Sequence, residues 1–137
     1  MMRSWILPLV FVAAGAIMAI ALPGSGVAML AAFVLLAGLH SPLIFPRSVT
    51  AAEARRRSAV DGRPIVYWRP GCKFCIRLRI RLGSHAGRLH WVNIWRDPDG
   101  AADVRAVNDG NETVPTVVVA GQAHVNPAPG WVRGQLS

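Results

Sequence analysis

The segment "GCKFCIRLRIRLG", residues 71–83, decides the fold because two patterns within it predict different structures. From Ile76 to Leu82, apolar and basic residues alternate with the period of a strand. Cys72 and Cys75, in contrast, have the spacing that usually works at the start of a helix. The sequence on either side of the segment must distinguish between the two.

Two short apolar runs flank this segment and favour the helix. "PIVYW" (64–68) precedes it and "HWVNIW" (90–95) follows it, and both are β-branched and aromatic runs typical of buried strands. Parallel neighbouring strands need a crossover of about a dozen residues, which is usually helical. We therefore predict a helix over residues 72–84 with Leu78 and Leu82 on one side, whereas periodicity alone leaves a strand as the alternative.

The rest of the C-terminal half completes an α/β domain. Asp97-Pro98 is a typical helix start, an N-cap followed by proline at the first helical position, and Gly110 stops the helix that follows. The order predicted for residues 63–137 is β-α-β-α-β-β-α. Its later elements are a helix to about residue 108, strands over 116–120 and 123–125, and a brief helix after Pro129.

The first 46 residues are strongly apolar and predict a transmembrane hairpin. Residues 5–22 and 27–45 are uncharged runs of about the minimum length for crossing a hydrocarbon core of roughly 30 Å. Residues 23–26, "PGSG", would form the turn. A cleavable signal sequence is the alternative for the first run, because Arg3 supplies a charged start. The first run is long for a signal sequence, and the second follows it at once.

Positive charges flank the two apolar runs. Arg3 precedes the first run, Arg47 and residues 55–57 follow the second, and such charge stays on the cytoplasmic side of a membrane. We therefore expect a two-span protein of the inner (plasma) membrane, with a basic juxtamembrane linker over residues 47–62 and the C-terminal domain (63–137) in the cytoplasm. The net charge of +8 does not indicate a nucleic-acid partner, because the basic residues are not interleaved with stacking aromatics.

Cys72 and Cys75 are the two cysteines of the chain, so they cannot staple distant segments together. A thiol attacks as its thiolate, and a free cysteine with a pKa near 8.5 is mostly protonated at neutral pH. A helix N-terminus, with Arg69 and Lys73 close in sequence, should lower the pKa of Cys72. We therefore expect Cys72 to be the nucleophile. Cys75, one turn into the helix and more buried, would attack the Cys72 sulfur in a mixed disulfide.

Two histidines permit a metal site as the alternative. Cys72, Cys75, His85 and His90 superficially resemble a zinc site with two cysteines and two histidines. The interval before His85 is shorter than in the usual zinc finger, and two arginines of the predicted helix would crowd a cation. We therefore expect no metal.

Two separated motifs together resemble the glutaredoxins of the thioredoxin superfamily. "VYWRPGCKFC" (66–75) is followed about forty residues later by "TVPT" (113–116), and "VNDGNETVPTV" (107–117) with Asn126-Pro127 is most similar to the actinobacterial mycoredoxins. The resemblance covers about residues 64–132. It implies a minimal thioredoxin fold and a thiol–disulfide oxidoreductase without a bound cofactor. It also implies a low-molecular-weight thiol, mycothiol or glutathione, as co-substrate and disulfide-containing proteins as partners.

The resemblance assigns roles to individual residues. Arg69 matches the basic residue that glutaredoxins place three positions before the nucleophile to bind a carboxylate of the thiol. Phe74 matches the aromatic residue inside the motif. Val114 precedes what would be a cis proline, Pro115, which leaves the Val114 backbone free to pair with an extended substrate. The expected substrate-binding residues are therefore Arg69, Lys73, Phe74, Thr113, Val114 and Pro115.

The sequence departs from the family pattern after the last strand. The Gly-Gly-x-x-Asp pattern that clasps glutathione in many glutaredoxins is missing, and "HVNPAP" (124–129) stands there, which favours mycothiol over glutathione. Trp68 and Trp131 are candidates to line the groove. The alternative functions are a dithiol electron relay, from a thioredoxin-reductase-like donor to a membrane partner, and a non-catalytic binding module.

Overall fold

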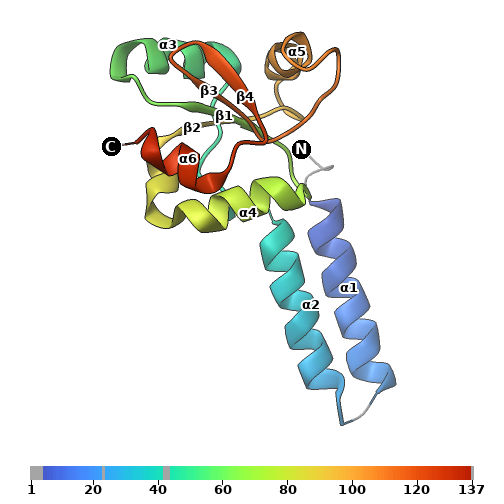
Figure 1. Ribbon diagram of the computed structural model, residues 1–137. Coiled ribbons are helices and arrows are strands. Elements are labelled where there is room, and N and C mark those ends of the chain that lie inside the picture. Colours follow the sequence, from blue (N-terminus) through green and yellow to red (C-terminus); the bar gives the residue numbers. More distant parts are fainter. Residues whose placement is uncertain (1–4, 23, 42–43, 137) are drawn as a thin grey trace. The chain divides into compact units, whose positions relative to one another are not determined.

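Residues 5–22, 24–41 and 44–136 are described by the computed structural model shown in Figure 1. The chain divides into two units, Met1–Ile44 and Phe45–Ser137. The first unit holds helices α1 (Ile6–Ala21) and α2 (Gly26–His40), which pack side by side. Gly15 permits the close approach of these helices, because a Cβ atom at that position would lie 2.7 Å from the Cβ of Phe33.

The predicted transmembrane hairpin is wrong. Within the described residues, the structure contains no helix with both the length and the apolar character needed to cross a membrane. Helix α1 has 16 residues and α2 has 15, whereas a membrane-spanning helix needs about 20. The predicted localisation, as a protein that crosses the inner membrane twice, is wrong for the same reason. Arg3 and Pro23, on which parts of that prediction relied, lie outside the described residues.

The second unit is built on a four-stranded sheet of order β2-β1-β3-β4. Strand β1 pairs with β2 in parallel, with Val66 opposite Trp91, and the other two pairings are antiparallel. The parallel arrangement of the two flanking strands is thus confirmed. The strands are β1 (Ile65–Trp68), β2 (His90–Asn93), β3 (Thr116–Val119) and β4 (Gln122–Val125).

The decisive segment is helical, as the crossover argument predicts. Helix α4 (Lys73–Leu82) joins β1 to β2 and continues into the 3-10 helix η3 (Gly83–Arg88). Leu78 and Leu82 are buried, whereas Ile80 is 54% exposed. The alternation of apolar and basic residues therefore reflects two sides of one helix, of which only one packs into the domain.

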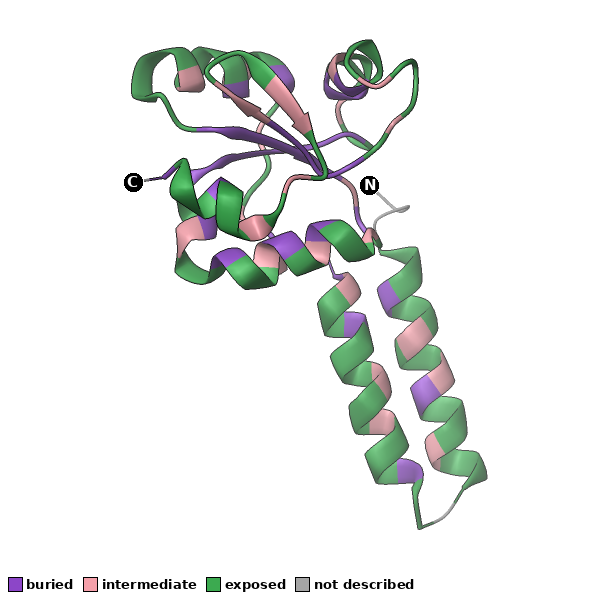
Figure 2. Cartoon of the chain, viewed as in Figure 1, coloured by how far each residue is buried: buried purple, intermediate pink, exposed green. Residues whose placement is uncertain are grey.

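Helices cover both faces of the sheet. Helix α4 packs with α6 (Pro129–Gly134) on one face, and α3 (Ala51–Asp61) lies with α5 (Pro98–Ala106) on the other, as Figure 1 shows. Strands β1 and β2 between these layers are buried along their whole length (Figure 2). This is the β-α-β-α-β-β-α arrangement expected from the sequence, with α3 added before it.

Helix α3 lies within residues 47–62, the interval predicted to be a basic linker. Its N-cap is Thr50, whose hydroxyl oxygen accepts a hydrogen bond from the Glu53 backbone N–H at 3.2 Å. Gly62 ends the helix in the left-handed conformation, with φ at 68°, which glycine adopts without steric cost. The pair Thr50-x-x-Glu53 is a capping-box signature and would have predicted this helix.

The arginines of α3 make ion pairs within the domain. Arg56 and Arg57 contact the Glu53 carboxylate at 2.5 Å and 2.6 Å, and Arg55 pairs with Asp103 of α5. These arginines therefore have intramolecular partners. Hydrogen bonds and charges of Arg57 and Arg56 hold the pKa of Glu53 below its usual value, with Arg57 as the largest cause and burial opposing it.

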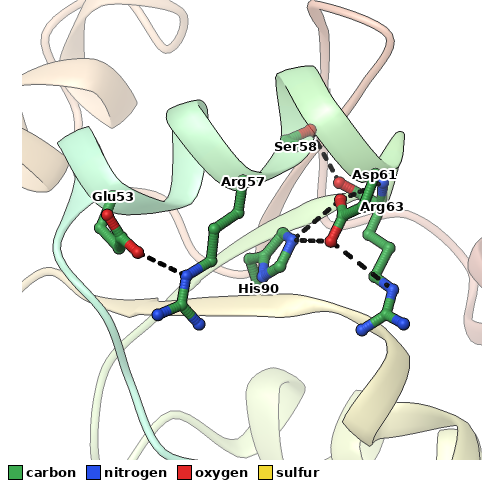
Figure 3. A network of polar contacts seen from close by, with 6 residues as sticks. All are labelled: Glu53, Arg57, Ser58, Asp61, Arg63 and His90. Carbon is green, nitrogen blue, oxygen red and sulfur yellow. Dashed lines mark hydrogen bonds and ion pairs between the residues drawn. The ribbon is translucent and has the colours of Figure 1, made fainter.

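A second polar network anchors the end of α3 to the start of β2 (Figure 3). The His90 ring nitrogen lies 2.9 Å and 3.1 Å from the two Asp61 carboxylate oxygens, and the Arg63 backbone N–H donates to the same carboxylate at 3.0 Å. The Ser58 hydroxyl donates to the Arg63 carbonyl at 2.7 Å. Burial raises the pKa of Asp61, but the hydrogen bonds from Arg63 and His90 outweigh it and leave the pKa below the usual value.

The Asp97 carboxylate accepts hydrogen bonds from the first turns of two helices, α3 and α5. Asp97 accepts hydrogen bonds from the backbone N–H groups of Asp99 and Gly100 at 3.1 Å and 3.2 Å, which is the N-cap predicted for α5. Its other oxygen accepts from the Ala51 N–H at 2.5 Å. Asp97 thereby links the start of α3 to the start of α5.

Aromatic side chains form much of the core. The Phe45 ring stacks on Trp68 with centroids 3.8 Å apart and meets Trp91 edge-on at 5.5 Å. Trp68 is 2% exposed, and its indole N–H donates to the Ser48 hydroxyl at 3.0 Å. Trp68 is therefore a core residue and does not line a groove.

Candidate active site

Cys72 lies between the end of β1 and the start of α4. The turn Arg69-Pro70-Gly71 follows β1, and Gly71 adopts a φ of 76°, which favours glycine. Cys72 is the N-cap of α4, and its sulfur accepts a hydrogen bond from the Cys75 backbone N–H at 3.2 Å. The sulfur thus takes the place that a capping oxygen usually occupies, at the positive end of the helix dipole.

The two cysteines differ in exposure and share a direct contact. Both are free thiols; Cys72 is partly exposed, and Cys75 is fully buried. The Cys75 thiol donates to the Cys72 sulfur, with the two sulfurs 2.7 Å apart. When protonated, Cys72 donates to the Val114 carbonyl at 3.3 Å. Cys72 is therefore the cysteine that a second molecule can reach, and Cys75 is buried in contact with it.

The environment stabilises a thiolate on Cys72. The hydrogen bond from the Cys75 thiol is the largest cause that lowers the pKa of Cys72 to about 6. Burial opposes the shift, whereas the backbone N–H groups of Cys75 and Phe74 and the charge of Arg69 support it. Burial, followed by the hydrogen bond to Cys72 and its charge, raises the pKa of Cys75. The two shifts have opposite directions, so the Cys72 thiol ionises at a lower pH than the Cys75 thiol.

Three of the expected substrate-binding residues lie beside Cys72 in the turn and first turn of α4. Arg69 is partly exposed, and Lys73 and Phe74 are exposed. The Lys73 ammonium lies 5.0 Å from the centroid of the Phe74 ring, a distance typical of a cation–π contact. Of the two cationic residues close to Cys72 in the sequence, Arg69 has a charge that acts on the thiol.

The other three expected residues form the loop before β3. The Val114–Pro115 peptide bond is cis, as the resemblance implied. Val114 and Pro115 are buried, and the Val114 carbonyl approaches Cys72. Thr113 is exposed, and its carbonyl accepts from the Thr116 hydroxyl at 2.8 Å. The fold therefore brings Val114 to Cys72 from a position 42 residues further along the chain.

Two features of this region were not predicted as parts of the site. The Asn126 backbone N–H donates to the Pro115 carbonyl at 2.7 Å and ties the end of β4 to the proline loop. The Cys75 backbone N–H holds the Cys72 sulfur, an interaction that no side-chain motif reveals. Trp131, expected in the groove, is 38% exposed, with its ring centroid 4.3 Å from that of His124.

The histidines of the alternative zinc site are placed elsewhere. His90 starts β2 opposite Ile65, the first residue of β1, whereas Cys72 follows the other end of β1. His85 lies in η3 beyond the far end of α4. Among residues 5–22, 24–41 and 44–136, no group of three or more His, Cys, Asp or Glu side chains is arranged to hold a metal ion.

A cavity of about 530 Å³ lies on the opposite face of the sheet, between α3, α5 and the strands. Its polar side is a chain of three groups, in which the Tyr67 hydroxyl donates to Asp103 at 2.8 Å and Asp103 pairs with Arg55. Burial and the Asp103 charge raise the pKa of Tyr67. None of the expected site residues lines this cavity, which lies on the face of the sheet that α3 and α5 cover.

Comparison with known proteins identifies the class. The sequence profile of the glutaredoxin family matches residues 65–125. Two proteins of Mycobacterium tuberculosis named "Putative glutaredoxin", from strains CDC 1551 and H37Rv, are each 35% identical to this chain over 72 residues, which cover 52% of this chain and 86% of the relative. No solved structure gives a significant match. The chain belongs to the glutaredoxin family and is a thiol–disulfide oxidoreductase, as the motifs predicted.

Proposed function

We propose that Cys72 is the nucleophile that removes a low-molecular-weight thiol from protein mixed disulfides. The observation that carries this proposal is the lowered pKa of a partly exposed sulfur that caps α4 and lies beside the Val114 carbonyl. The thiolate attacks the small thiol's sulfur, the protein thiolate leaves, and a disulfide forms between Cys72 and the small thiol. The protein is reduced in this step, and the small thiol is carried on the enzyme.

A second molecule of the small thiol then regenerates the enzyme. Its thiolate attacks the sulfur bound to Cys72, a disulfide of two small thiols leaves, and Cys72 returns as thiolate. Cys75 could attack instead, but burial is the largest cause of its raised pKa and persists after Cys72 loses its charge. A protonated thiol is a poor nucleophile. The monothiol route is therefore the proposed main route.

We further propose that mycothiol is preferred over glutathione as the small thiol. The segment after β4 lacks the Gly-Gly-x-x-Asp pattern of many glutathione-binding glutaredoxins. It resembles the actinobacterial mycoredoxins instead, and the two relatives described above come from a mycobacterium. Arg69 and the exposed edge at Thr113 remain the proposed contacts of the thiol's polar groups.

The choice of thiol is tested by turnover of one peptide presented in two forms, as its mycothiol and its glutathione mixed disulfide. We expect kcat/KM for the mycothiol form, with mycothiol as reductant, to exceed that of the all-glutathione reaction by about tenfold, the equivalent of 1.4 kcal/mol of differential recognition. Equal values would remove the preference and leave the chemistry at Cys72 unaffected.

A dithiol electron relay is the second candidate, favoured by the 2.7 Å separation of the two sulfurs. In that function, Cys75 attacks the Cys72 mixed disulfide, the small thiol leaves, and the Cys72–Cys75 disulfide is reduced by a thioredoxin-reductase-like donor. Such a relay needs Cys75, whereas the monothiol route does not. A purified reductase added in place of the small thiol distinguishes them, because it supports turnover only in the relay.

A further inference from the structure

The exposed side of α4 carries positive charge along its border with α6. Arg77 and Arg81 of α4 and Arg133 of α6 are all exposed and surround a hollow of about 260 Å³ whose remaining walls are Pro129 and Gly130. The Arg133 guanidinium donates to the Arg81 carbonyl, which fixes α6 against this part of α4. We call these three arginines the α4–α6 basic surface.

The α4–α6 basic surface lacks ion pairs with acidic side chains of the described residues. Within the described part of the chain, none of its three arginines forms an ion pair, whereas Arg55, Arg57 and others on the opposite layer pair with carboxylates. Like charges that line one hollow repel one another, and an anion placed there would be attracted by all three. The surface is therefore complementary to an acidic partner.

The α4–α6 basic surface is continuous with the active site. Phe74, Arg77 and Arg81 are spaced i, i+3 and i+7, so they follow one side of α4 away from its Cys72 end. Phe74 is 43% exposed and supplies an apolar contact next to the thiol. A chain that is bound through its sulfur at Cys72 can therefore extend along this side of the helix.

We propose that the α4–α6 basic surface docks an acidic segment of the protein whose mixed disulfide is reduced. The proposal rests on the function proposed for Cys72 and names the class of its protein substrate. At about 1.5 Å per residue, Arg77 and Arg81 lie roughly 7.5 Å and 13.5 Å along the helix from Cys72. An extended peptide rises about 3.3 Å per residue, so the acidic residues belong about two to four positions from the substrate cysteine.

The test compares three peptides with one cysteine each, carried as the same mixed disulfide. One peptide has Asp or Glu two to four positions from the cysteine, one has Ser there, and one has Lys. We expect the wild-type protein to turn over the acidic peptide with a kcat/KM at least tenfold above the Ser peptide, and the Lys peptide to be poorest. The advantage should shrink as salt is raised, because exposed charges are screened.

The double variant Arg77→Glu/Arg81→Glu should lose the preference for the acidic peptide. Its matched control is Arg88→Glu/Arg96→Glu, which makes the same charge change at two exposed arginines outside α4 and α6. The control should keep the preference. Turnover of bis(2-hydroxyethyl) disulfide, a small uncharged substrate, should be the same in all three proteins, which shows that Cys72 still functions.

Two outcomes overturn the docking proposal while the function proposed for Cys72 stands. One is equal kcat/KM for the acidic and Ser peptides, and the other is the same loss in both double variants. Binding of a short DNA duplex that depends on Arg77 and Arg81, without any peptide preference, would reassign the surface to nucleic acid. In contrast, absence of turnover for every mixed disulfide would overturn the proposed function itself.

Discussion

Replacement of Cys72 by Ser is expected to lower kcat/KM for a peptide–mycothiol mixed disulfide by about 10³-fold or more, a loss typical of removing a nucleophile. Serine can cap α4 as cysteine does, so the helix should stay intact. Its hydroxyl is not ionised near neutral pH and cannot exchange with a disulfide. The loss should therefore be one of chemistry and not of structure, as an unchanged circular dichroism spectrum would show.

The matched control for this variant is Cys75→Ser. The serine hydroxyl can still donate a hydrogen bond to the Cys72 sulfur, in place of the Cys75 thiol. On the monothiol route, we expect this variant to keep turnover with the small thiol within about threefold of the wild type, since mixed-disulfide exchange needs only one thiolate. Undiminished and equal activity in the two variants would remove the nucleophile assignment, whereas loss of activity in both would favour the relay.

Replacement of Trp68 by Ala is expected to lower the free energy of unfolding by about 3–5 kcal/mol. Trp68 is 2% exposed in β1, stacks on Phe45, and satisfies its indole N–H with Ser48. The truncation leaves a cavity in the core beside β1. Trp68 is the last residue of this strand, and the active-site turn begins at Arg69. Denaturant unfolding followed by circular dichroism measures the loss.

Trp131→Ala is the matched control for the core variant. Trp131 is 38% exposed in α6, so its truncation removes less buried surface. We expect it to cost less than about 1.5 kcal/mol, in keeping with a partly exposed site. A cost for Trp68→Ala as small as that for Trp131→Ala would contradict the placement of Trp68 in the core.

The sequence predicted the part of the fold whose geometry is restricted by chain connectivity. Residues 73–82 have a strand-like alternation, but they must cross between two parallel strands, and that requirement outweighs the local pattern. The same reasoning predicts Cys72 at a helix N-terminus. The approach of Val114 to Cys72 came only through the resemblance, since nothing local connects residues 42 positions apart.

Two errors have physical causes. The apolar N-terminal runs were judged by run length, but α1 ends at Ala21 and α2 at His40, so each helix is shorter than its run. Helix α3 is not predicted, because a run of arginines is also typical of a charged linker. Its ion pairs with Glu53 and Asp103 and the cap from Asp97 make such a charged helix compatible with a folded domain.

The pH dependence of Cys72 alkylation tests the central claim most directly. Iodoacetamide reacts with thiolate, and peptide mapping separates labelling of Cys72 from that of Cys75. With a pKa lowered to about 6, the rate should rise with pH through about 6 and level off above it. At pH 7, about ten thiolates would exist for each thiol.

Replacement of Cys75 by Ala should shift this midpoint upward, because the Cys75 thiol is the largest cause of the lowered pKa. The backbone N–H groups and Arg69 should still keep it below the value of a free cysteine. The contrary result is a wild-type midpoint near 8.5, the value of free cysteine, together with no change of the midpoint in Cys75→Ala. That result would contradict the account of an ionised Cys72 at the N-terminus of α4.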